Sequence, residues 1–160
     1  MSEERSVRIT ELEQQEEELV FDSFDHRDAW RLGSLLAERA LSASAGVAID
    51  IRRPGLILFR AALPGSTPDQ ESWIEGKSAV VLRMEGSTAL LAERFAEHGI
   101  DASRGWLPMP AYAIAGGSFP VRVRGVGVVA AVTVSGLSSD ADHDLIVGGI
   151  REFLRSTKAA

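Results

Sequence analysis

The sequence predicts an α+β fold, within the broad α/β class, in which helices flank a mainly antiparallel central sheet. Two observations support this prediction. Pro54-Gly55 separates two apolar, β-branched-rich runs, at 47–51 and 56–63, which is typical of a β-hairpin. In addition, the expected order is helix, strand, helix, two strands, two helices, two or more strands, helix. This order lacks the regular β-α alternation of a parallel sheet.

Helices are expected where apolar residues recur at three- and four-residue intervals and small polar residues precede them. Asp25 or Asp28 can cap the second helix, and Ser66, Thr67 or Asp69 can cap the third. The first helix is acidic and has only a sparse apolar stripe. The five expected helices cover residues 9–19, 27–42, 69–84, 88–98 and 139–157.

Strands are expected in short apolar runs, at 20–24, 47–51, 56–63, 111–115, 119–124 and 128–134. The run at 128–134 is apolar almost throughout, which indicates a central strand covered on both faces. In a domain of this size we expect the second cover to come from another subunit.

Composition narrows the class of protein. The chain has 160 residues, a formal net charge of −6 and no cysteine. The absence of cysteine excludes disulfide and thiol chemistry, and the negative balance argues against a nucleic-acid-binding or anionic-membrane surface. We expect one domain over 1–160, with an acidic helical arm over 1–19 and a core over 20–157. Because the N-terminal stretch is acidic and no long apolar segment occurs, a cytoplasmic location is expected.

The segment from Ser135 to Asp144 is the most suggestive cluster of polar residues. Asp142 and His143 at the end of a central strand suit a metal site or an acid/base pair. They equally suit a strand-to-helix turn with acidic capping. Adjacent residues on a helix diverge by about 100°, which disfavours a shared ligand. A nucleophilic Ser135 paired with His143 lacks a G-x-S-x-G motif, so no catalytic residue and no metal ligand is assigned.

Two further features offer ligand contacts. Gly116-Gly117, which leads into Phe119, can present backbone N–H groups to an anion, or it can be a bare turn. Trp73 and Lys77 are four residues apart on an expected helix, so that Lys77 can hold a carboxylate or phosphate, or can pack over the indole ring.

Five motifs then occur in one order along the chain: Asp28-Ala29-Trp30-Arg31-Leu32-Gly33, Ala62-Leu63-Pro64-Gly65-Ser66, Trp73-Ile74-Glu75-Gly76-Lys77, Gly116-Gly117-Ser118-Phe119-Pro120, and Val134-Ser135-Gly136-Leu137 with Asp142-His143. The series resembles the haem-degrading HbpS-like superfamily, and within it the cytoplasmic, uncharacterised branch that includes a small yeast protein. The resemblance implies a profilin-like fold and homo-oligomers, either dimers or assemblies of dimers.

Three hypotheses about function follow. The first is a non-catalytic ligand-binding or scaffold protein with a pocket at a subunit interface. The ligand residues expected for that pocket are Trp73, Lys77, Gly116, Gly117, Phe119, Ser135, Gly136, Asp142 and His143. The second is a haem-binding or haem-degrading protein, with His26, His98, His143, Tyr112 or a methionine as axial donor. The third is an enzyme that acts on a small organic acid.

Overall fold

A four-stranded sheet forms the middle of the structure, a computed structural model that describes residues 2–159. Its strands are β1 (Ala48–Arg53), β2 (Leu56–Ala62), β3 (Ser118–Val123) and β4 (Gly127–Ser135), in the spatial order β2-β1-β4-β3. All three strand pairings are antiparallel. The predicted α+β class and its antiparallel sheet are therefore confirmed.

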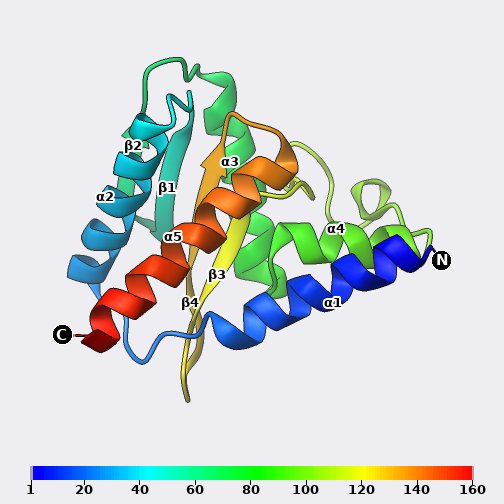
Figure 1. Cartoon of the computed structure of the whole chain (residues 1–160). Coiled ribbons are helices and arrows are strands. Elements are labelled where there is room, and N and C mark those ends of the chain that lie inside the picture. The colour runs from blue at the N-terminus through cyan, green and yellow to red at the C-terminus, as the bar shows by residue number, and fades with distance from the viewer. Residues whose placement is uncertain (1, 160) are drawn as a thin grey trace.

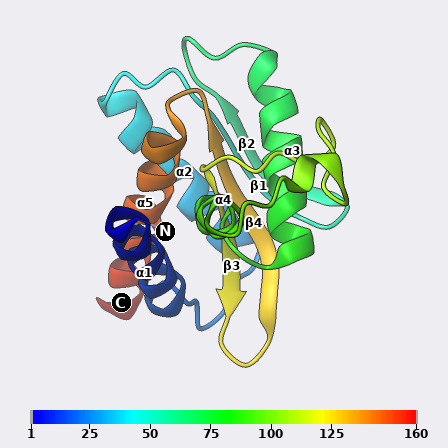
Figure 2. The same ribbon diagram turned by 90° about the vertical axis from the view of Figure 1, so that its right-hand side faces the viewer.

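Helices lie on both sides of this sheet (Figures 1 and 2). Helices α2 (His26–Ser42) and α5 (Ser139–Ala159) cover one face, and α3 (Asp69–Met84) covers the other. Helices α4 (Thr88–Glu97) and α1 (Glu3–Glu18) pack against each other on the β3 side. A 3₁₀ turn, η1 (Ala102–Arg104), lies in the long connection from α4 to β3.

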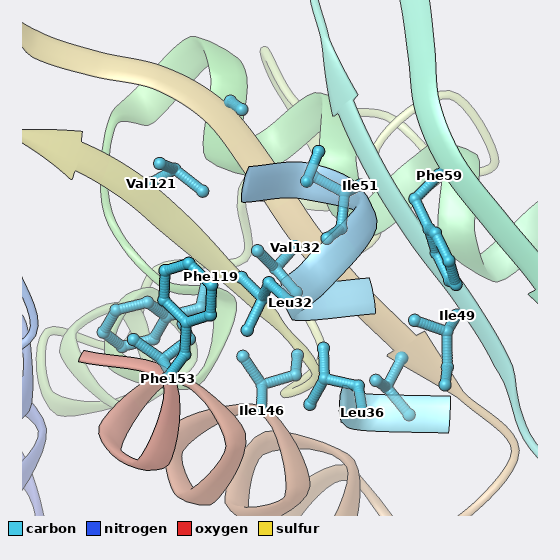
Figure 3. Packing of buried hydrophobic residues seen from close by; sticks show 14 of the residues in the cluster. Leu32, Leu36, Ile49, Ile51, Phe59, Phe119, Val121, Val132, Ile146 and Phe153 are labelled. Carbon is cyan, nitrogen blue, oxygen red and sulfur yellow. The ribbon is translucent and has the colours of Figure 1, made fainter. Parts of the chain in front are cut away.

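The face under α2 and α5 carries the main apolar core (Figure 3). Strand residues alternate between faces, so every second side chain of β1, β3 and β4 points into this core. Large side chains from the two helices fill the space above them. The labelled members are Leu32, Leu36, Ile49, Ile51, Phe59, Phe119, Val121, Val132, Ile146 and Phe153.

The opposite face, under α3, contains buried polar side chains. Asp50, Thr133 and Ser118 occupy one row across β1, β4 and β3 in the strand register, and all three are fully buried. The Ser118 and Thr133 hydroxyls lie 2.9 Å apart, and the Asp50 carboxylate accepts hydrogen bonds from Arg52 at 2.7 Å and Arg60 at 2.6 Å. This face is therefore held by polar contacts as well as by apolar packing.

The cover of β4 differs from expectation. Ala130 to Val134 are fully buried within the single chain, because α3 covers the face that α2 and α5 leave free. The prediction that another subunit supplies this second cover was wrong, since a helix of the same chain supplies it.

Two expected strands do not form. In the segment 20–24 only Phe21 makes a β-bridge, to Val123, before the chain turns into the Asp25 cap of α2. In the segment 111–115 the Ala113 N–H donates to the Gly76 carbonyl of α3 at 3.0 Å. The backbone of this segment therefore bonds to helix α3 and not to a neighbouring strand. A Cβ at Gly76 would lie 2.9 Å from the Ala113 Cβ, which explains why glycine permits this approach.

Helix boundaries agree with expectation except at some ends. Asp25 caps α2, as one of the two expected residues, and forms a capping box with Asp28. Helix α1 begins at Glu3 instead of residue 9, because the Ser2 side chain accepts from the Arg5 N–H and caps it. Helix α3 is preceded by Pro68 and has no side-chain cap, contrary to the three candidates.

Candidate functional site

A cavity of about 290 Å³ opens between α3 and the turn that joins β4 to α5. We call it the α3–α5 cavity. Its wall combines residues from three separated parts of the chain, and six of the nine expected ligand residues contribute to it. The lining residues are Asp69, Gln70, Trp73, Lys77, Ala115, Gly116, Ser135, Gly136, Leu137, Ser139 and Asp142.

Lys77 lies at the floor of this cavity and is almost fully buried, with 2% of its surface exposed. Its Nζ donates to the Val134 carbonyl at 2.6 Å, to the Gly116 carbonyl at 3.3 Å and to Asp142 Oδ2 at 3.5 Å. Burial lowers the pKa of Lys77, and the neighbouring carboxylate only partly opposes this effect. The amine thus joins α3 to β4, α5 and the loop before β3.

Asp142 belongs to the first turn of α5, and its carboxylate points back toward the end of β4. Oδ1 accepts a hydrogen bond from the Leu137 N–H at 3.0 Å, while Oδ2 faces Lys77. Burial raises the pKa of Asp142, and the positive charge of Lys77 counteracts this rise. Burial disfavours the charged form of both partners. Lys77 therefore holds its proton less firmly than an exposed lysine does.

The mouth of the cavity presents both apolar and hydrogen-bonding groups. Trp73 and Leu137 are 36% and 41% exposed. Gln70, Ser135 and Ser139 add an amide and two hydroxyls to the wall. The charged lining residues are Lys77, Asp69 and Asp142, so the wall has no surplus of positive charge. The arrangement suits a small molecule with several hydrogen-bonding groups.

Gly117 lies directly behind Lys77 and does not line the cavity. Its φ of +122° lies in a region that side-chain-bearing residues rarely adopt, and a Cβ there would come 2.5 Å from the Lys77 Nζ. The glycine pair therefore makes room for the buried amine, and the Gly116 carbonyl serves as one of its acceptors.

Phe119 and His143 lie away from this cavity. Phe119 points into the core under α5 (Figure 3). His143 is fully buried, with its Nε2 2.7 Å from Gln15 Oε1 of α1. Burial lowers its pKa to about 4, and Arg8 acts in the same direction, so the imidazole is neutral at pH 7. Asp142 and His143 therefore point to different partners, and the contacts of a Ser135–His143–Asp142 triad are absent from the hydrogen bonds of residues 2–159.

Some lining residues were not foreseen. Gln70 precedes Trp73 by three residues and Lys77 by seven, which is the spacing of one helical face and was therefore a readable signal. Leu137 directly follows the predicted Gly136, whereas Asp69 precedes Trp73 by four residues and Ser139 precedes Asp142 by three, again the spacing of one helical face. Ala115 directly precedes the predicted Gly116, but its own side chain carries no hydrogen-bonding group that would mark it as a ligand contact.

Metal binding finds no support in the described part of the chain, where no group of three or more His, Asp or Glu side chains could hold an ion. Between residues 2 and 159, none of the helices is long and apolar enough to cross a membrane.

Comparison with known proteins identifies the family. The model of the family described as haem degrading protein HbpS-like matches residues 24–151. The chain belongs to the HbpS-like family. A UPF0303 protein of Streptomyces coelicolor is 52% identical over 149 residues, which cover 91% of this chain and 93% of that protein. A UPF0303 protein of Acidobacterium capsulatum is 44% identical over 138 residues, covering 85% and 83%.

Several solved structures share the fold. The crystal structure of Ybr137w protein superimposes with a TM-score of 0.84 and 28% identity, covering 94% of this chain and 90% of that one. HbpS has a TM-score of 0.68 and 21% identity, with coverage of 81% and 89%. The PduOC:Heme complex has a TM-score of 0.68 and 17% identity, with coverage of 81% and 94%. The last two similarities concern the fold alone.

The α3–α5 cavity offers haem no axial donor. The lining of the α3–α5 cavity includes no histidine, tyrosine or methionine. Met109 and Tyr112 line a second cavity, beside α4, of about 320 Å³. This second cavity shares no lining residue with the α3–α5 cavity, and its lining includes no histidine. His26 and His98 are exposed, and His143 is enclosed under α1. The haem alternative is therefore not favoured.

Proposed function

We propose that this protein binds a small polar molecule, without transforming it, in the α3–α5 cavity. One observation carries the proposal: polar side chains from α3, from the β4–α5 turn and from α5 converge on one cavity above a buried Lys77–Asp142 pair. Burying two opposite charges costs free energy that apolar side chains of similar volume would avoid. A cavity that keeps such a pair at its floor is a good candidate for ligand recognition.

The same geometry defines the class of ligand. All three protons of the Lys77 ammonium already have protein acceptors, so a ligand anion would compete with Asp142 and two carbonyls. The groups that remain for a ligand are the side-chain NH2 of Gln70, whose Oε1 already accepts from Thr67, and the hydroxyls of Ser135 and Ser139, with Trp73 as an apolar side wall. We therefore propose a compact, uncharged or zwitterionic ligand that carries hydroxyl or carbonyl groups. We also propose that the protein is located in the cytoplasm.

A cavity-filling variant tests this proposal. Ala115 lines the cavity and is half-buried, whereas Ala111 in the same segment is exposed and lies outside it. A library of small water-soluble metabolites is screened by ligand-observed NMR against the natural protein, Ala115→Phe and the matched control Ala111→Phe. We expect hits that persist in Ala111→Phe and disappear in Ala115→Phe. Hits that persist equally in both variants, or a library without hits, would refute the proposal.

We further propose that a second copy of the chain covers the mouth of the cavity in a homo-oligomer. Trp73 and Leu137 support this, since both expose large apolar surface at the rim. The test is the solution mass by native mass spectrometry. Leu137→Glu is expected to reduce the subunit count, whereas Val126→Glu, at an equally apolar and more exposed position in the β3–β4 turn, is expected to leave it unchanged. The reverse pattern would place the interface at that turn.

A further inference from the structure

Lysine is rare in this chain, and its two copies occupy opposite environments. Only two of the 17 cationic side chains are lysines, Lys77 and Lys158. Lys158 is exposed near the end of α5, whereas Lys77 is buried at the floor of the α3–α5 cavity. Elsewhere the chain uses arginine even for a buried carboxylate, since Arg52 and Arg60 neutralise Asp50. The cavity floor is thus a place where a primary amine, and not a guanidinium, is retained.

A primary amine can do chemistry that a guanidinium cannot. A neutral lysine amine attacks aldehydes and ketones, and burial favours the neutral form. We propose that Lys77 holds its ligand through a reversible Schiff base, so that the ligand is a small aldehyde or ketone that also carries hydroxyl groups. This inference rests on the proposed function and deepens it, because it names the reacting group and the ligand class.

The proton balance is met by the residues present. Asp142 Oδ2, 3.5 Å from the Lys77 Nζ, takes one proton from the ammonium and leaves a neutral amine. The amine lone pair forms the C–N bond to the carbonyl carbon while the carbonyl π-bond breaks, and Asp142 returns its proton to the oxygen. Asp142 then takes a second proton from the nitrogen and delivers it to the hydroxyl, which leaves as water while the nitrogen lone pair forms the C=N bond. The product is a protonated imine, which retains one positive charge beside Asp142, and no oxidant or reductant is consumed.

The contacts around the amine suit this step. The Val134 carbonyl, at 2.6 Å, holds Nζ in place, while the Gly116 contact at 3.3 Å is longer and more easily exchanged for a ligand. Burial raises the pKa of Asp142 and lowers that of Lys77, and both shifts reduce the free energy of proton transfer from the amine to the carboxylate. Gln70 and Ser139 lie on the wall where ligand hydroxyls would be placed.

Reductive trapping tests the inference. The full-length protein is incubated at neutral pH with glycolaldehyde, an uncharged hydroxyaldehyde, and sodium cyanoborohydride, which converts an imine to a stable secondary amine. Peptide mass mapping then compares Lys77 with Lys158, the internal exposed control. We expect Lys77 to be labelled at least about tenfold faster than Lys158, because the cavity orients the aldehyde against the amine.

Three variants separate this reaction from non-specific labelling. Lys77→Arg keeps the positive charge and should give no adduct at that position. Asp142→Asn keeps the amine but removes the proton acceptor, and should slow labelling of Lys77 while Lys158 is unaffected. Ala115→Phe fills the cavity and should protect Lys77. Circular dichroism and thermal melting of each variant establish that it is folded.

Two outcomes would overturn the inference. One is labelling of Lys77 that is no faster than that of Lys158, and the other is rapid labelling that Ala115→Phe does not reduce. If the metabolite hits remain sensitive to Ala115→Phe while Lys77 stays unlabelled, the binding function stands and the Schiff base is refuted. If neither hits nor labelling are found, both proposals fail.

Discussion

The two faces of the central sheet are buried by different kinds of side chain. Toward α2 and α5 the sheet presents only apolar side chains, which pack as one continuous core. Toward α3 it presents the buried row of Asp50, Thr133 and Ser118, and beside them the Lys77–Asp142 pair. Apolar burial stabilises a fold at little cost, whereas buried charges must be compensated by specific partners. The first face thus provides the continuous apolar core, and the proposed ligand site lies on the second.

The largest expected effect is on the apolar face. Phe119→Ala removes a fully buried ring from the core and should reduce the free energy of unfolding by about 3–5 kcal/mol. Chemical denaturation measures this loss. Ligand binding by the fraction that remains folded should be unchanged, because Phe119 lies on the opposite face from the cavity. Loss of binding in folded Phe119→Ala would break the division between the two faces.

A smaller effect is expected at the buried pair. Lys77→Met leaves the Asp142 carboxylate and two carbonyls without their donor and should cost about 2–4 kcal/mol in the free energy of unfolding. Adding Asp142→Asn removes the uncompensated charge, so the double variant should lose less than the two single variants together. Denaturant midpoints of the four proteins test this. Strict additivity would mean that the two groups do not interact.

The pH dependence of stability should come in part from His143, at the junction with α1. Its pKa is about 4 in the folded protein and about 6.5 in an unfolded chain. The unfolded state therefore binds the extra proton first, and the free energy of unfolding falls as the pH is lowered from 6.5 toward 4. The loss attributable to this group should reach about 3 kcal/mol at most.

His143→Gln provides the matched control for that titration. The variant keeps a polar side chain near Gln15 but cannot take up a proton in this range. Melting temperatures of both proteins between pH 7 and 4.5 should show a shallower decline for the variant. Parallel curves would mean that His143 is not protonated on unfolding in this range.

The smallest expected effect is at the surface. Arg124 and Asp22 form an ion pair at 3.2 Å, but both side chains are largely exposed. Water and salt screen such pairs, so Arg124→Ala should change the free energy of unfolding by less than about 0.5 kcal/mol. A loss as large as that of Lys77→Met would show that charge pairs contribute alike whether buried or exposed, contrary to the expected difference between them.

Much of the fold could be predicted from local patterns. The Pro54-Gly55 hairpin and the cap at Asp25 depend on neighbouring residues alone, and both occur as expected. The apolar run at 20–24 was mistaken for a strand, because Phe21 is buried and yet makes only one bridge. Burial of a short apolar run does not reveal whether its backbone is paired.

The candidate site could be predicted only in part. The spacing of Trp73 and Lys77 predicted that both lie on one helical face. The family motifs led us to expect Gly116 and Ser135 in the same pocket, and all four residues line the cavity. His143 was grouped with Asp142 because the two are adjacent, but the helical turn of about 100° sends it to α1 instead. Ala115 was missed because its side chain carries no hydrogen-bonding group, although it directly precedes Gly116.

Ligand binding in the α3–α5 cavity is tested most directly by a protein-observed NMR titration of the ¹⁵N-labelled chain with the metabolite hits. We expect shifts to concentrate on the Trp73 indole N–H and the Gly116, Gly136 and Leu137 amides, which surround the α3–α5 cavity. Amides under α2 and α5 should be unaffected. Shifts centred on the second cavity beside α4, or spread over the apolar core, would contradict binding in the α3–α5 cavity.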